Sequence, residues 1–304
     1  MMKAGKYLFV GAFLIYIIII FAVFTYKDKF VDVHTIVLSL FLVAFLIGQS
    51  RSFLREFVPF TIIIFAYQIM RGYADDLAGH VNIGNIIRVE RFLFGNVPTV
   101  VLQKKFYTHG SYHIYDFLAF TLWALHFVVP LAFAFILWRY RKRLYWQFVL
   151  SLICLTFAGF ITYVIFPLAP PWLASRIGDL EHVSLIRDDL LNSFQFGKST
   201  SLFIIYATPN HVAAMPSLHA AYPCLVFLYI LRYFRKFAIP AFIYCIALWT
   251  SLVYGGDHYV LDVLVGIIYA VISFFIIEIA IEKTAFKKYF DVEELSEIKL
   301  AQNR

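Results

Sequence analysis

The chain has 304 residues, of which 62% are hydrophobic and only 15% are charged. Soluble globular domains are about half apolar and about a quarter charged, and here the apolar residues gather in long runs such as Leu14–Ala22 and Val271–Ile281. This composition excludes a water-soluble domain, a disordered chain and a disulfide scaffold, and it predicts an all-α polytopic membrane protein. The net charge of +7 then indicates basic cytoplasmic loops rather than a nucleic-acid partner.

Eight apolar segments are candidates for transmembrane helices, each of which needs about 20 residues with some allowance for tilt. The first lacks a small-residue cleavage site after it, so we expect a retained helix rather than a signal peptide. The second and third are short. The predicted spans are roughly Tyr7–Phe24, Val33–Gly48, Leu54–Met70, Phe117–Trp138, Phe148–Phe166, Ser217–Phe234, Phe237–Tyr254 and His258–Ile281.

The distribution of Lys and Arg predicts an orientation for these spans. With the N-terminus in the cytoplasm, the basic loops that begin at Arg51, Arg139 and Arg232 and the basic C-terminal tail all fall on the cytoplasmic side. Both termini are then cytoplasmic, and the long loops 71–116 and 167–216 are extracytoplasmic or lumenal. The expected parts are N-terminal transmembrane helices at 1–53, a catalytic transmembrane core at 54–282 and a cytoplasmic tail at 283–304.

The loop 71–116 interleaves apolar and charged residues, which predicts one or two amphipathic helices in the membrane interface. Such helices either cap the bundle or gate the entry of lipid. Arg71, at the outer end of the third span, is the obvious guanidinium for a bidentate phosphate contact, with Asp75 close by. The alternative is an interfacial Arg that pairs with Asp75.

The sixth span opens with the stretch Met215–Ala221, which reads MPSLHAA. Pro216 followed by Ser217 is a helix-start signal, with Ser217 as the N-cap and His219 in the first turn. Free N–H groups at such a helix start suit an anion such as phosphate. The alternative is an ordinary capped helix with an interfacial histidine.

The eighth span opens with Tyr254–Asp262, which reads YGGDHYVLD. Two glycines predict a tight turn, and His258 and Asp262, four residues apart, are expected to share one helix face. A carboxylate in that place orients the imidazole and raises its basicity, as a nucleophile or base requires. A purely structural His–Asp pair is the alternative. The three cysteines, Cys154, Cys224 and Cys245, fall in apolar runs and indicate buried thiols rather than disulfides or a zinc site.

The two histidine motifs, PSLHAA and then YGGDHYVLD, resemble the type 2 phosphatidic acid phosphatase superfamily, most closely its inositol phosphorylceramide synthase branch. The stretch Glu90–Gly95 (ERFLFG) and the Pro170-Pro171-Trp172 triplet are also similar to that branch. The resemblance implies a six-helix catalytic core and a metal-independent, cofactor-free transfer through a phosphohistidine. It assigns the nucleophile to His258, its orienting partner to Asp262 and the acid to His219.

The resemblance also places Ser217 beside the phosphate. We further expect Asp75 and Asp257 to contribute to the substrate or phosphate site. Two basic positions of the broader family are missing: the last motif has Ser251-Leu252 where the family has Ser-Arg, and the motif KxxxxxxRP has no match in the chain. A site with little positive charge suits a phosphodiester, which carries one negative charge, better than a dianionic phosphomonoester.

The leading hypothesis is therefore a phosphotransferase that moves a phosphoryl-linked head group, with phosphoinositol as the candidate, from a phospholipid donor to a lipid alcohol. A lipid phosphatase that acts on phosphatidic acid or a polyprenyl diphosphate is the alternative, with water as the acceptor. A transporter with a buried His258–Asp262 proton relay is a third hypothesis, but we find no inverted repeat to support it.

Overall fold

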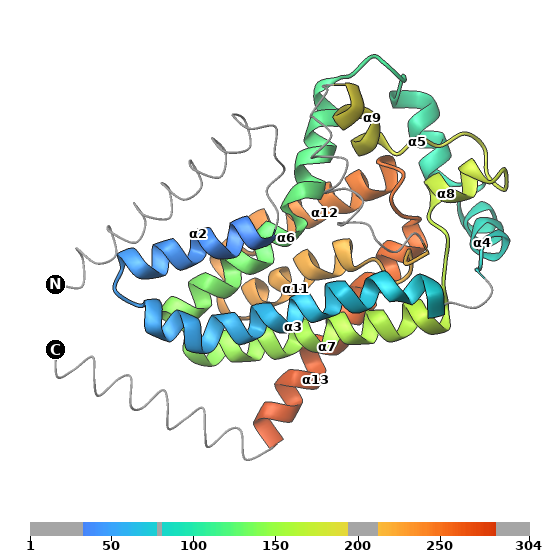
Figure 1. Cartoon of the computed structure of the whole chain (residues 1–304). Helices are drawn as coiled ribbons and strands as arrows, with labels where there is room; N and C mark the ends of the chain where they lie inside the picture. Colours follow the sequence, from blue (N-terminus) through green and yellow to red (C-terminus); the bar gives the residue numbers. More distant parts are fainter. Residues whose placement is uncertain (1–32, 78–80, 194–211, 284–304) are drawn as a thin grey trace. The chain divides into compact units, whose positions relative to one another are not determined.

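The computed structural model describes residues 33–77, 81–193 and 212–283, shown as coloured ribbons in Figure 1. Over these residues the regular structure is helical, with isolated β-bridges and no strand. This confirms the predicted all-α membrane bundle. The first predicted span, 7–24, lies outside the described residues, so the count of eight stays a prediction. Within the described ranges, four helices are long and apolar enough to cross a membrane: Ile114–Tyr140, Lys142–Ile165, Arg235–Tyr254 and Val260–Lys283.

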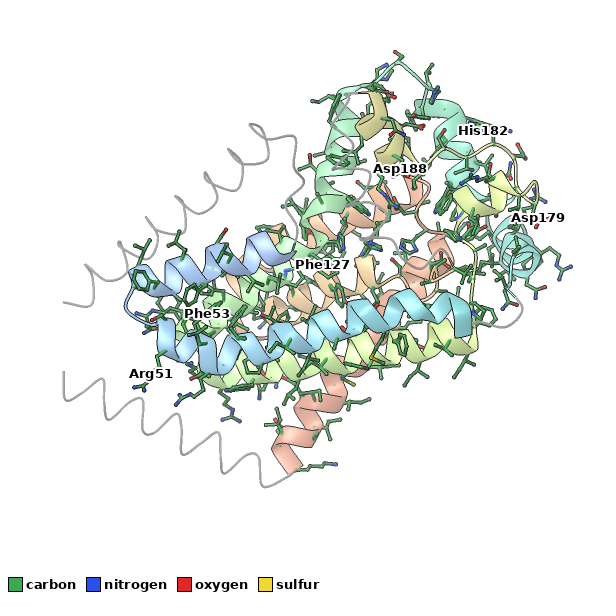
Figure 2. The ribbon with its side chains drawn as sticks, in the orientation of Figure 1. Arg51, Phe53, Phe127, Asp179, His182 and Asp188 are labelled. Atoms are coloured by element: carbon green, nitrogen blue, oxygen red, sulfur yellow. The ribbon has the colours of Figure 1, made fainter. Side chains whose placement is uncertain are left out.

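The chain divides into two compact units, the first made of residues 1–72 and 188–210 and the second of residues 73–187 and 211–304. In the first unit, α2 (Val33–Leu46) is followed by α3 (Ser50–Leu77), whose last residues belong to the second unit. Phe53, labelled in Figure 2, packs its ring on Phe41 of α2 and stacks on Phe57 at 4.7 Å between ring centroids. These two helices correspond to the second and third predicted spans.

The second unit contains a bundle of the α-helices α6 (Ile114–Tyr140), α7 (Lys142–Ile165), α11 (Leu218–Tyr233), α12 (Ala238–Tyr254) and α13 (Val260–Lys283). In this bundle α11 packs against α6, α7, α12 and α13. Two buried pairs of hydroxyl groups join α11 to α7: Tyr229 with Ser151 at 2.9 Å, and Tyr222 with Thr156 at 3.1 Å. Such bonds satisfy polar groups that lipid could not solvate.

The cysteines are free thiols, as predicted. Cys224 of α11 and Cys245 of α12 are buried, and the Cys245 thiol donates a 3.4 Å hydrogen bond to the carbonyl oxygen of Pro223. Here they behave as small apolar side chains that fill the contact between two helices.

Short helices of the second unit gather beyond one end of its bundle (Figure 1). The loop 71–116 forms α4 (Gly84–Phe94) and α5 (Pro98–Phe106), in agreement with the one or two helices expected there. On α4, Ile86, Ile87 and Glu90 are buried, whereas Phe92 is 87% exposed. An apolar side chain left exposed beside charged residues suits the surface of a bilayer.

The segments that precede α4, follow α7 and precede α11 meet at Leu168. Leu168 forms parallel β-bridges with Asn82 on one side and with Ala213 on the other. The loop after α7 also forms α8 (Pro171–Arg176) and α9 (Ile186–Ser193), of which α9 begins in the second unit and ends in the first. The loops 71–116 and 167–216 are therefore joined at the same end of the bundle of the second unit.

Candidate active site

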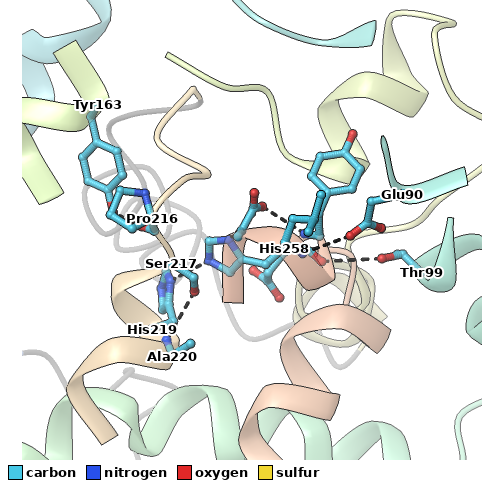
Figure 3. A network of polar contacts seen from close by, with 12 residues as sticks. Glu90, Thr99, Tyr163, Pro216, Ser217, His219, Ala220 and His258 are labelled. Atoms are coloured by element: carbon cyan, nitrogen blue, oxygen red, sulfur yellow. Dashed lines mark hydrogen bonds and ion pairs between the residues drawn. The ribbon is translucent and has the colours of Figure 1, made fainter. Parts of the chain in front are cut away.

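The structure brings together the two histidines that lie 39 residues apart in the chain. Nδ1 of His219 lies 3.0 Å from Nε2 of His258, and Nδ1 of His258 lies 3.5 Å from an oxygen of the Asp262 carboxylate (Figure 3). His258 is 4% exposed and Asp262 is fully buried. The three side chains form a continuous line from the buried Asp262 carboxylate to His219 in the first turn of α11.

The order of the three groups indicates one arrangement of the ring protons. With the Nδ1 proton of His258 turned toward the Asp262 carboxylate 3.5 Å away, Nε2 of His258 carries a lone pair that can accept a hydrogen bond from Nδ1–H of His219. A carboxylate behind one imidazole is the usual way of orienting a nucleophile or a base. The geometry therefore places an imidazole nitrogen backed by a carboxylate face to face with a second imidazole.

The start of α11 is held in place through its backbone. Ser217 is the N-cap, as predicted, and its hydroxyl accepts a 3.2 Å hydrogen bond from the N–H of Ala220. The Ser217 N–H donates to the carbonyl oxygen of Asp262 at 3.0 Å. Gly266 allows this approach, because a Cβ there would lie 2.3 Å from the Ser217 carbonyl oxygen. The backbone of the Ser217 motif thus rests directly on the helix that carries Asp262.

The His258 loop is held differently from the prediction. α13 begins at Val260, so His258 precedes the helix instead of lying on its face. The Asp262 carboxylate turns back to accept the Tyr259 N–H at 2.9 Å, in the manner of an N-terminal capping residue. This turn, rather than a shared helical face, brings Asp262 to within 3.5 Å of His258.

Gln103 of α5 ties this loop to the segment after α8. Its side-chain amide donates to the carbonyl oxygens of Tyr254 at 2.7 Å and Ser184 at 2.9 Å, and its carbonyl oxygen accepts the Ser184 N–H at 2.9 Å. Gly256 has a φ of +85°, and a Cβ at this position would lie 2.4 Å from the Ser184 carbonyl oxygen. The tight turn predicted from the two glycines is therefore also a close packing contact.

Three side chains near the histidines were not predicted. Arg187, 6% exposed, forms an ion pair with Asp257 of the His258 loop, and its guanidinium carbon lies 4.7 Å from the centre of the Trp123 ring. On α6, the Trp123 and His126 rings lie 6.3 Å and 4.3 Å from the His219 ring, measured between centroids. A single Arg in a long loop carries no local signal, so sequence reasoning sought the cation at Arg71 instead.

The predicted phosphate contacts have different outcomes. Ser217 and Asp257 lie beside the histidines, but the carboxylate of Asp257 is engaged by Arg187. Arg71 and Asp75 fall in α3, and their side chains lie outside the described residues. Contacts of Arg71 and Asp75 with phosphate stay predictions.

Glu90, from the ERFLFG stretch, lies behind the site. It is fully buried, and one carboxylate oxygen accepts the N–H of Leu261 at 3.0 Å. Its other oxygen has no hydrogen-bond partner within the described part of the chain. Burial raises the pKa of Glu90 to about 7; the Leu261 N–H opposes this rise, and the nearby Asp262 carboxylate adds to it.

Comparison with known proteins agrees with this geometry. The family model described as "PAP2 superfamily" matches residues 84–276, which include both histidine motifs, Glu90 and Arg187. The chain belongs to the PAP2 superfamily. This confirms the resemblance drawn from the two motifs.

A curated relative of this PAP2 superfamily chain is the phosphoinositol dihydroceramide synthase of Bacteroides thetaiotaomicron. The two are 28% identical over 269 residues, which cover 85% of this chain and 88% of the relative. No solved structure matches the chain. Family and relative together make the chain an integral membrane enzyme of the lipid phosphotransferase and phosphatase class, with membrane lipids as substrates.

Proposed function

We propose that the chain transfers a phosphoinositol-type head group from a phospholipid donor to a lipid alcohol through a phosphohistidine on His258. The observation that carries the proposal is the line Asp262–His258–His219, with 3.5 Å and 3.0 Å between its members. The name of the Bacteroides relative supports the head group and suggests dihydroceramide as the acceptor.

In the first half of the reaction, Nε2 of His258 attacks the phosphorus of the donor and forms a P–N bond. The bond from phosphorus to the diacylglycerol oxygen breaks, and His219 gives its proton to that oxygen. Asp262 stabilises the positive charge that develops on His258. The 3.0 Å contact between the rings leaves no room for a phosphoryl group, so we expect the donor to enter between them and separate them.

In the second half, the hydroxyl group of the acceptor lipid attacks phosphorus and gives its proton to His219. The P–N bond breaks, the head group leaves on the acceptor, and His258 is neutral again. Since His258 supplies the nucleophile and His219 the proton, the proposed route requires neither a metal ion nor a cofactor.

A phosphatase would use the same first half with water as the acceptor. The Arg187–Asp257 ion pair favours the transferase, because a cation already neutralised by a carboxylate suits the single charge of a phosphodiester. The test is to incubate the detergent-purified protein with labelled phosphatidylinositol, with and without dihydroceramide, and to identify the products by mass spectrometry. A head group that appears on dihydroceramide supports the transferase, whereas release of free inositol phosphate at the same rate with and without dihydroceramide would contradict it.

We also propose that the site faces the extracytoplasmic or lumenal side, with both termini in the cytoplasm. The positive-inside distribution of Lys and Arg supports this orientation. The contacts of Gln103 with Ser184 and Tyr254 add to the support, because they require three loops predicted on one side of the membrane to meet.

A further inference from the structure

Arg187 is a buried cation next to the His258 loop for which the sequence motifs assign no role. Its backbone segment is attached to that loop, because the N–H of Ile186 donates to the carbonyl oxygen of Gly255 at 3.1 Å. Its side chain pairs with Asp257, the residue immediately before His258. Arg187 is thus fixed to the His258 loop through both its backbone and its side chain.

Trp123 of α6 contacts both Arg187 and His219. The Arg187 guanidinium carbon lies 4.7 Å from the centre of the Trp123 ring, and the His219 ring stacks on the same indole at 6.3 Å and 29°. Arg187 therefore contacts a residue adjacent to each histidine: Asp257, which precedes His258 in the chain, and Trp123, which contacts the His219 ring.

We propose that Arg187 binds the phosphate of the donor lipid and that Asp257 makes this contact selective for phosphodiesters over phosphomonoesters. The proposal rests on the proposed function, since it concerns the phosphate that His258 attacks. A guanidinium has five N–H donors in a planar fork, so it can hold a carboxylate and a phosphate together. The ion pair with Asp257 engages the Nη1 end of that fork.

The selectivity follows from charge. With Asp257 in place, the pair is neutral, and it offers hydrogen bonds to a monoanionic diester without a net attraction for a second negative charge. A phosphomonoester is close to a dianion at pH 8, because its second pKa lies near 6, and its additional charge is repelled by the Asp257 carboxylate.

The test measures binding rather than turnover, so its outcome is separate from that of the transferase assay. The protein carries His258→Ala, and the probes are dodecyl phosphate, a monoester, and methyl dodecyl phosphate, a diester, titrated by calorimetry at pH 8 in an uncharged detergent. We expect the diester to bind about tenfold more tightly than the monoester. Arg187→Gln and Arg187→Lys should each weaken the binding of both probes about tenfold or more. Gln removes the positive charge, and Lys keeps the charge but lacks the planar fork.

Asp257→Asn gives the decisive comparison. We expect it to strengthen binding of the monoester about tenfold and to change binding of the diester much less. The matched controls are Arg176→Gln and Asp179→Asn, exposed residues of the same loop, which should leave both dissociation constants within twofold.

Two results would overturn the proposal. One is an Arg187→Gln protein that keeps its thermal stability and binds both probes within twofold of the parent. The other is an Asp257→Asn protein that binds both probes more weakly by the same factor. That result would show that the Arg187–Asp257 ion pair stabilises the structure and does not select between the two phosphate esters. If Asp257→Asn does not fold, Asp257→Ser in the same titration decides between these results.

Discussion

At the scale of single residues, Asp262 distinguishes the two histidines, and in the proposed mechanism it makes His258 the nucleophile. Its carboxylate lies 3.5 Å from Nδ1 of His258, and Pro223 stands where a partner four residues after His219 would lie. The sequence predicted this asymmetry, and the structure retains it even though His258 lies outside the helix. Position at a helix start does not distinguish the two rings, whereas the buried carboxylate does.

We expect Asp262→Asn to lower kcat by about 10³- to 10⁴-fold, because an amide does not hold His258 in the required tautomer or stabilise its positive charge. Head-group transfer by the purified protein measures this loss. Asp179→Asn, at an exposed position, should retain full activity. An Asp262→Asn enzyme within tenfold of wild type would show that the pair is structural.

Glu90 gives the stability of the protein a pH dependence. The pKa of Glu90 is about 7 in the folded protein, against an ordinary value of 4.5, so between these values only the folded state holds the proton. The free energy of unfolding therefore falls as the pH rises through this window, by about 3 kcal/mol in all. Glu90→Gln imitates the protonated form and should remove this fall.

The measurement is the melting temperature in detergent at pH 5 and pH 8. Glu90→Gln should melt above wild type at pH 8 and close to it at pH 5. Glu181→Gln is the matched control, because Lys104 lowers the pKa of that exposed carboxyl, and its effect at pH 8 should be small and of opposite sign. If Glu90→Gln shifts the melting temperature equally at pH 5 and pH 8, the titration of Glu90 does not cause the pH dependence of stability.

At the scale of helices, α11 and α13 approach closely next to the histidines, where the Ser217 N–H donates to the Asp262 carbonyl oxygen at 3.0 Å. Gly266 lets the backbone of Ser217 approach, and a Cβ there would meet a carbonyl oxygen that cannot swing away as a side chain would. We expect Gly266→Ala to destabilise the protein by about 2 kcal/mol and to lower turnover at least tenfold by moving His219 away from His258.

Thermal unfolding and transfer activity, measured on the same preparation, test this expectation. Gly84→Ala is the control, because Gly84 has no atom within 4 Å of the position that a Cβ would take. If Gly266→Ala behaves like Gly84→Ala in both measurements, the close contact does not position the site.

Sequence reasoning located the helices whose signals are local. Apolar length predicted the four described helices that are long and apolar enough to cross a membrane, and Pro216-Ser217 predicted the start of α11 to the residue, because capping depends only on neighbouring residues. The start of α13 was wrong by two residues, since the Asp262 carboxylate turns back to cap the Tyr259 N–H. Arg187, Trp123 and His126 were missed because only the packing of distant segments brings them to the site.

At the scale of the whole molecule, the proposed orientation predicts which surfaces are accessible from outside the cell or vesicle. Asp179, in the loop after α8, and Arg141, between α6 and α7, are both exposed in the structure. We expect an impermeant thiol reagent to label Asp179→Cys in intact cells and Arg141→Cys only after permeabilisation. The reverse pattern would place the site in the cytoplasm.

The central claim is that His258 carries the phosphoryl group, and trapping the intermediate tests it most directly. The protein is mixed with a donor that carries radioactive phosphorus and a good leaving group such as p-nitrophenol, quenched in alkali and mapped by peptide. We predict an acid-labile label on His258 that disappears in His258→Ala and still forms slowly in His219→Ala. A label on His219, or one that persists in His258→Ala, would contradict the account.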